Sequence, residues 1–171
     1  MRPCLTLAIA VALAACAREA APGEPPAKAL SCAASEGGAV SAEGAWLREQ
    51  KDASAVTAAY FSLCNGSMKP ATLVGVTTPL AAETGLHETT RDANGLVSMA
   101  PISEVTLAPG ERALFEPGGK HAMLHGLAGP IAGGDHAELT LLFADGATLT
   151  LEAVAKTPAE AASVQSSREG R

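Results

Sequence analysis

The stretch GGKHAMLHG, residues 118–126, places His121, Met123 and His125 at alternate positions. On an extended chain, residues two apart point to the same face, so two imidazoles and a thioether would share one side of a strand. A core face usually consists of branched aliphatic side chains, and methionine is uncommon on a solvent-exposed face. The pattern therefore indicates either a poor core face or a metal site.

Two more candidate ligands precede this strand. His87 lies in GLHETTRDANGLVSMAP, and Met99 follows the turn that the DANG sequence predicts. A hairpin turning there would bring His87 and Met99 near each other, because opposing side chains of paired strands lie about 5 Å apart. With His121 and Met123 they make a set of two imidazoles and two thioethers.

This donor set predicts which ion is bound. Thioethers are poor donors to zinc, magnesium and calcium and good donors to Cu(I), which accepts low-coordinate or tetrahedral sites of nitrogen and sulfur. A blue-copper electron carrier needs a cysteine with two histidines, and no cysteine follows Cys64. The sequence thus favours a Cu(I) site and excludes a blue-copper site in the C-terminal half.

Each of these residues also has an ordinary interpretation. His87 could be a surface histidine that hydrogen-bonds to Glu88 or to the threonines after it. Met99 or Met123 could fill gaps in a core. Parity puts His125 on the ligand face, where it could ligate the metal or only lie beside the ligands, and we expect the second role.

The composition fits one small exported domain with extensions. The chain has 171 residues, with 12 Lys and Arg against 18 Asp and Glu, and a formal net charge of -6. Binding to nucleic acid needs a clustered basic face, and the sequence has none, so we expect no nucleic-acid partner.

The N-terminus predicts export. Residues 1–15 hold an arginine and a short apolar run, as in a signal peptide, and the run ends in LAAC, which resembles the lipobox of bacterial lipoproteins. Cys16 would then become the acylated N-terminus and tie the protein to a bacterial membrane on the periplasmic side. The alternative is ordinary cleavage after an A-x-A site, with Cys16 a bystander.

Cys32 and Cys64 are the other two thiols of the mature chain. An even pair in an oxidising compartment usually forms a disulfide, which would add about 3–4 kcal/mol by restricting the unfolded chain. The competing interpretation makes the two cysteines metal ligands, although their spacing has no C-x-x-C pattern.

The rest of the chain predicts an all-β domain. Residues 16–37 are rich in Ala, Pro and charge and predict a lipidated, flexible tether, and residues 157–171 are polar and aperiodic and predict a disordered tail. Between them, residues 38–156 consist of short β-type runs separated by turn signals such as NG, PG and DG, with no helical stretch. This spacing predicts a Greek-key β-sandwich or barrel.

One hairpin can be predicted in detail. In LTLLFADGATLTLEAV, Leu139, Leu141 and Phe143 alternate with other residues and should face the core. Asp145 and Gly146 predict a two-residue turn in which both residues have positive φ.

Residues 40–156 resemble the periplasmic copper(I) chaperone family PCu(A)C. The similar stretches are AWLREQ, AAYFSLCN, LHETT, LAPGE, LFEPGGKHAML and LTLLFADG. The family motif, H-x10-M-x21-H-x-M, fits Met99, His121 and Met123, whereas eleven residues instead of ten separate His87 from Met99. The extra residue falls in the predicted turn, where loop length costs little.

The resemblance implies a cupredoxin-like sandwich with an exposed Cu(I) site. It implies a carrier rather than an enzyme, one that delivers copper to the CuA subunit of cytochrome c oxidase, directly or through a Sco-type thiol protein. We expect a monomer. Two other functions fit the sequence: a copper-buffering or resistance lipoprotein that transfers copper to no partner, and a metal-free adhesion-type sandwich.

Overall fold

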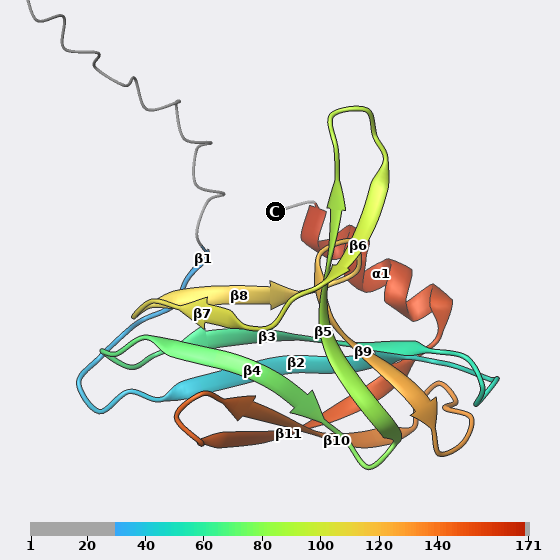
Figure 1. Ribbon diagram of the computed structural model, residues 1–171, viewed down its shortest axis with the longest axis horizontal. Coiled ribbons are helices and arrows are strands. Elements are labelled where there is room, and N and C mark those ends of the chain that lie inside the picture. The colour runs from blue at the N-terminus through green and yellow to red at the C-terminus, as the bar shows by residue number, and fades with distance from the viewer. Residues whose placement is uncertain (1–29, 170–171) are drawn as a thin grey trace, which may run out of the picture.

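The computed structural model describes residues 30–169, which form eleven strands and one helix (Figure 1). The signal peptide predicted over residues 1–15 and the lipidation site predicted at Cys16 lie outside the described residues. The elements are β1 Leu30–Ser31, β2 Val40–Arg48, β3 Thr57–Asn65, β4 Ala71–Thr77, β5 Ala81–Arg91, β6 Val97–Pro101, β7 Val105–Leu107, β8 Glu111–Phe115, β9 Lys120–Leu127, β10 His136–Phe143, β11 Thr148–Lys156 and α1 Pro158–Glu169.

The strands form one mixed sheet in the order β6-β5-β9-β8-β3-β2-β11-β10-β4-β7, with β1 paired to β8. Strand β9 pairs with β5 on one side and with β3 and β8 on the other, so it lies inside the sheet. The sheet curls around its buried side chains as a sandwich, which confirms the all-β, cupredoxin-like prediction (Figure 1). The β5–β6 hairpin projects from this body (Figure 1).

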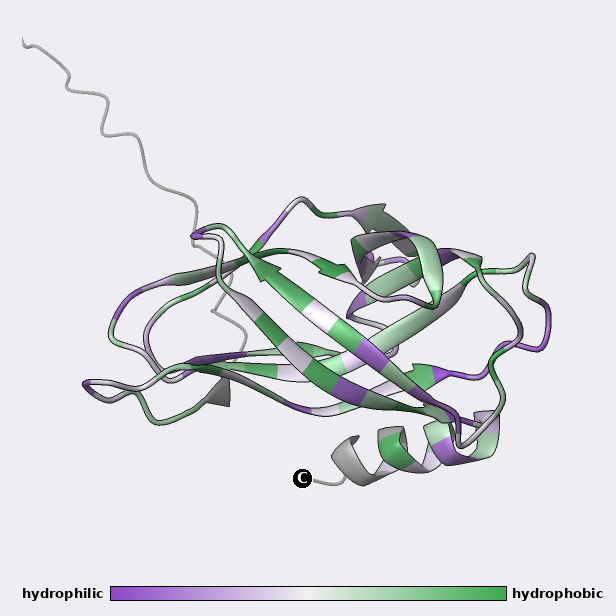
Figure 2. Cartoon of the chain, turned by 90° about the horizontal axis from the view of Figure 1, so that it is seen from below, coloured by the Kyte–Doolittle hydropathy of each residue, from purple (hydrophilic) through white to green (hydrophobic). Residues whose placement is uncertain are grey.

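The core follows the alternation of the strands, which is visible as alternating colours in Figure 2. Leu139 and Leu141 are fully buried and Phe143 is 7% exposed, as predicted for β10. The turn after β10 differs from the prediction, because Gly146 has a φ of 84° and no non-glycine residue among the described ones has positive φ. A single left-handed glycine fits a longer loop, in which the amide of Gly146 donates to the carbonyl of Phe143.

The predicted tether, residues 16–37, is too long at its C-terminal end. Leu30 and Ser31 pair with β8, and the amide of Cys32 donates to the carbonyl oxygen of Gly110 at 2.8 Å. Cys32 and Cys64 form a disulfide with an S–S distance of 1.98 Å. The disulfide was predicted from the sequence, whereas the pairing of Leu30 and Ser31 with β8 was not, because composition alone does not indicate it.

The prediction of a disordered tail over residues 157–171 is wrong, because Pro158–Glu169 form α1. Thr157 precedes the helix, and its amide donates to Glu160 Oε2 at 2.9 Å while the amide of Glu160 donates to Thr157 Oγ1 at 3.4 Å. This reciprocal capping box, with Pro158 at the first helical position, satisfies free amides at the helix start. The hydrogen bonds from Thr157 lower the pKa of Glu160 and so keep its carboxylate charged.

Helix α1 packs on an aromatic pair. Ala161 is buried with Trp46 and Tyr60, whose ring centroids lie 4.4 Å apart. The ammonium of Lys156, just before the helix, lies 5.6 Å from the centroid of the Trp46 ring. Within residues 30–169, no helix is long and apolar enough to cross a membrane.

Candidate metal centre

The β5–β6 hairpin positions two of the predicted ligands. Asp92 organises its turn, since its Oδ1 accepts from the amides of Asn94 and Leu96 at 2.9 Å each. The resulting register pairs His87 with Pro101 and Thr89 with Met99. Residues directly opposite in an antiparallel pair point to the same face, so His87 and Met99 share a face. They are diagonal neighbours rather than the opposing pair that the sequence predicted.

The pairing of β5 with β9 extends this face. Opposite pairs along the two strands are His87 with His121, Gly85 with Met123, and Glu83 with His125. Their register is regular, so the three pairs stand in three successive rows on one side of the sheet. We call this side, from Met99 on β6 to Met123 on β9, the ligand face.

His121 is held in one orientation. Its side chain is buried, with 4% exposed, and its Nδ1 lies 3.0 Å from the carbonyl oxygen of Gly119. Because a carbonyl oxygen only accepts, Nδ1 carries the proton in the neutral ring, and the lone pair is left on Nε2. An imidazole with Nδ1 fixed in this way is prepared to bind a metal through Nε2.

His87 stands edge-on to His121, with ring centroids 5.9 Å apart and an interplanar angle of 86°. Its Nδ1 is buried and has no hydrogen-bond partner among the described residues. Burial, followed by the nearby His121 and His125, lowers the pKa of His87. The ring is therefore neutral at neutral pH, which is the form that binds metals.

The two methionines differ in their surroundings. Met123 is partly buried in the middle of β9, between Gly85 on one side and Ala58 of β3 on the other. Met99 is 52% exposed and lies one row beyond His87, opposite Thr89. Diagonal neighbours on paired strands are about 7–8 Å apart, which a methionine side chain spans. The structure thus brings His87, His121 and Met123 together and leaves Met99 at their solvent-facing edge.

His125 lies on the ligand face, two residues beyond Met123 and opposite Glu83. Tyr60 lies on β3, which pairs with β9 on the side away from β5, and its ring centroid is 6.3 Å from that of His121. Burial raises the pKa of Tyr60, so its phenol stays protonated and is a neighbour of the site rather than an anionic ligand. The contact from Tyr60 could not be predicted from the sequence, because it depends on how β2, β3 and α1 pack.

The usual metal-binding side chains do not gather in threes in the described domain. Over residues 30–169, no group of three His, Cys, Asp or Glu side chains is placed to hold a metal ion. A metal on the ligand face would therefore need sulfur from methionine in addition to the two imidazoles. That combination suits a soft ion such as Cu(I), so the residues present fit copper.

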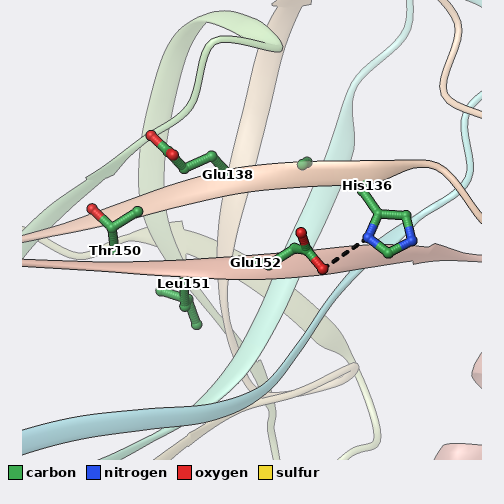
Figure 3. Close-up of a pocket in the computed structure, with 6 residues that line it drawn as sticks. His136, Glu138, Thr150, Leu151 and Glu152 are labelled. Carbon is green, nitrogen blue, oxygen red and sulfur yellow. Dashed lines mark hydrogen bonds and ion pairs between the residues drawn. The ribbon is translucent and has the colours of Figure 1, made fainter.

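A second feature with a histidine lies away from the ligand face. Figure 3 shows a surface hollow on β10 and β11, in which Nδ1 of His136 lies 2.9 Å from Oε1 of Glu152. His136 is exposed, as its position after a Gly-Gly-Asp turn suggests. The residues that line the hollow are His136, Ala137, Glu138, Thr150, Leu151 and Glu152.

Residues 40–155 match the family described as "Putative lipoprotein LpqE-like". A curated relative, "Putative lipoprotein Lxx21020" of Leifsonia xyli subsp. xyli (strain CTCB07), is 35% identical over 105 residues, or 61% of this chain and 61% of the relative. The chain thus spans less than two thirds of the length of that relative.

Solved structures share the fold. The Cu(I) form of DR1885 from Deinococcus radiodurans is 34% identical, with 76% of this chain and 81% of that chain covered and a TM-score of 0.54. The copper-bound PCuAC domain from PmoF2 is 22% identical, with 75% and 99% covered and a TM-score of 0.57. The apo PCuAC domain from PmoF1 is 24% identical, with 71% and 96% covered and a TM-score of 0.58.

The family match covers most of the described domain, and the solved structures are copper-binding PCuAC domains or have their fold. Both findings agree with the resemblance seen in the sequence. The chain therefore belongs to the LpqE-like lipoprotein family, and its β-domain has the fold of the PCuAC copper chaperone domains.

Proposed function

We propose that this protein is a lipid-anchored Cu(I) chaperone of the periplasm, which binds one copper ion through His87, Met99, His121 and Met123. The observation that carries the proposal is the ligand face itself. Its two imidazoles stand opposite each other on β5 and β9, and Met123 lies in the next row. The likeness to Cu(I)-DR1885, at 34% identity, supports copper as the cargo.

The site combines fixed and accessible donors. His121 is held by the Gly119 carbonyl and His87 is kept neutral by its surroundings, so both imidazoles are prepared before copper arrives. Met99 is half exposed on the projecting hairpin, where a partner can reach it. Copper would leave by ligand exchange, in which thiolates of the partner replace the thioethers, because thiolates are the stronger soft donors. The protein acts in this scheme as a carrier and not as an enzyme.

The recipient we propose is the CuA subunit of cytochrome c oxidase, reached directly or through a Sco-type thiol protein. The competing function is copper buffering, which would use the same site without transfer. A transfer assay separates the two. The Cu(I)-loaded protein is mixed with an apo acceptor that carries a pair of thiols, and copper is followed in both after separation. Copper that stays on this protein despite a tighter-binding acceptor would indicate buffering.

The purified mature protein should bind one Cu(I) per chain and bind zinc far more weakly, because two of its four donors are thioethers. Titration against a chromophoric Cu(I) chelator measures the first affinity, and competition with a zinc dye measures the second. A matched control is His136→Ala, which removes an exposed histidine far from the ligand face and should leave both affinities unchanged. Tighter binding of zinc than of Cu(I) would contradict the proposal.

The thiols give a separate prediction about the anchor. Under non-reducing conditions, alkylation of the exported protein should find Cys32 and Cys64 blocked by their disulfide, and Cys16 should carry the acyl group. Cys16→Ala should move the protein from the membrane fraction to the soluble fraction without changing Cu(I) affinity. A wild-type protein that is already soluble would remove the lipid anchor and leave the copper proposal intact.

A further inference from the structure

We propose that Gly85 leaves open the space that a copper ion would need: an ion held by Nε2 of His87 and the thioether of Met123 would come close to the backbone of β5 at Gly85. This inference rests on the proposed copper function and specifies a residue that supplies no donor atom. Gly85 stands in the middle of the ligand face, in the row of Met123 and next to the row of His87 and His121.

The fold does not require a glycine at this position. Gly85 is inside β5, its φ is not in the left-handed region, and the register with β9 runs through it without a bulge. A Cβ built there would meet nothing closer than Nε2 of His87 at 3.5 Å, an ordinary van der Waals distance. By contrast, a Cβ at Gly38 would lie 1.9 Å from the carbonyl oxygen of Gly66, so the fold does require that glycine.

A glycine that the fold does not need is unfavourable in a strand. It has no side chain to pack, and it loses more conformational freedom on folding than any other residue. Glycine inside a strand often marks a place where a ligand approaches the backbone closely. Glycine inside a strand can also mark a bulge, a tight bend or the close approach of another backbone. The register of β5 with β9 is regular, and a Cβ at Gly85 would have only atoms of the His87 ring within 4 Å beyond its chain neighbours, so close approach of a ligand is the explanation that we adopt.

The surroundings of Gly85 identify that ligand. The atoms nearest to its missing side chain are Nε2 and Cδ2 of His87, at 3.5 Å and 3.9 Å, so the imidazole presents its Nε2 edge to this position. Directly opposite Gly85 on β9 stands Met123. Bonds between imidazole nitrogen and a metal are about 2 Å long. An ion bound to this edge and a methyl group at position 85 would therefore compete for the same space.

Gly85→Ala tests whether the ion needs the space at Gly85, because the substitution should change stability and copper binding in opposite directions. The apoprotein should unfold at higher urea concentration than wild type, since alanine restricts the unfolded chain and fits the strand. Its Cu(I) affinity should fall by about tenfold or more, as for other changes next to a metal site. Gly85→Val, with a larger side chain, should reduce the affinity further.

Gly75→Ala is the matched control. Gly75 is also inside a strand, β4, without positive φ, and a Cβ there would lie 3.7 Å from Cδ1 of Leu142 and within 4 Å of no histidine or methionine side chain. The register of β4 with β10 shifts next to this position, between Leu142 and Phe143. This variant should gain stability as Gly85→Ala does and keep wild-type Cu(I) affinity.

Two results would overturn the proposed role of Gly85. One is a Gly85→Ala protein that binds Cu(I) like wild type, and the other is one less stable than wild type while Gly75→Ala is not, since the fold would then require the glycine. Failure of the wild-type protein to bind Cu(I) would instead overturn the proposed function.

Discussion

Met123→Leu lowers the Cu(I) affinity of the mature protein by more than about 100-fold, the upper end for changes outside a ligand set. Leucine nearly conserves the volume of methionine but has no sulfur, so the ion loses a soft donor while the packing of β9 against β3 and β5 is kept. The free energy of unfolding should change by less than about 1.5 kcal/mol. Chelator competition and urea denaturation of the same sample measure the two effects.

His125→Ala is the comparison for this result. His125 shares the ligand face with Met123 but lies one row farther from His87 and His121, opposite Glu83. We expect its Cu(I) affinity to stay within about tenfold of wild type, as for a residue beside the ligands. If His125→Ala lost copper while Met123→Leu bound it normally, the roles assigned to these two residues would have to be exchanged.

Cu(I) affinity falls as pH drops below about 6.5, the ordinary pKa of a histidine side chain, because imidazole must be neutral to bind and a thioether has no proton to lose. Burial, together with His121 and His125, lowers the pKa of His87, so this ring stays neutral to a lower pH than a free imidazole. The slope of log affinity against pH should therefore steepen as pH falls, toward two protons per copper if His87 and His121 both bind.

The slope is measured from about pH 8 down to a pH at which the apoprotein has protonated His87, and it is corrected for protonation of the chelator. A slope that never exceeds one over that range would remove one of the two histidines from the ligand set. The apoprotein gives an independent check on His87. Below about pH 6.5 the unfolded chain takes up a proton at this residue that the folded chain does not, so its contribution to stability decreases as pH falls. The decrease ends below the lowered pKa of the folded state.

The alternation of His121, Met123 and His125 was sufficient to predict one face of β9, because side-chain direction in a strand depends only on parity. The DANG turn likewise predicted the hairpin that carries His87 and Met99. The sequence could not give the row in which each residue stands. The row of Met99 depends on the length of the turn from Asp92 to Leu96, and the pairing of His87 with His121 depends on contacts between distant parts of the chain.

Two features of the structure were not predicted from the sequence, for different reasons. Helix α1 had a local signal in the sequence, the TPAE capping box at residues 157–160, but the absence of an apolar period hid it. Among the helix side chains that the structure describes, only Ala161 is buried, and it packs with Trp46 and Tyr60. Gly85 had no local signal, since a glycine in a strand acquires meaning only from the side chains on neighbouring strands, here His87 and Met123.

The disulfide between Cys32 and Cys64 determines how mechanical load would reach the domain. If the chain is anchored through Cys16, a force from the membrane acts first on β1. Only two residues of β1 pair with β8, so this strand would separate from the sheet at low force. The load then stops at Cys32 and passes through the covalent bond to Cys64 in β3, a strand at the centre of the sheet. Strands β5 and β6, which carry His87 and Met99, lie at one end of the strand order and would bear little of that tension. Strand β9, which carries His121 and Met123, pairs with β3, so a pull on the anchor would reach the copper ligands through these two residues first.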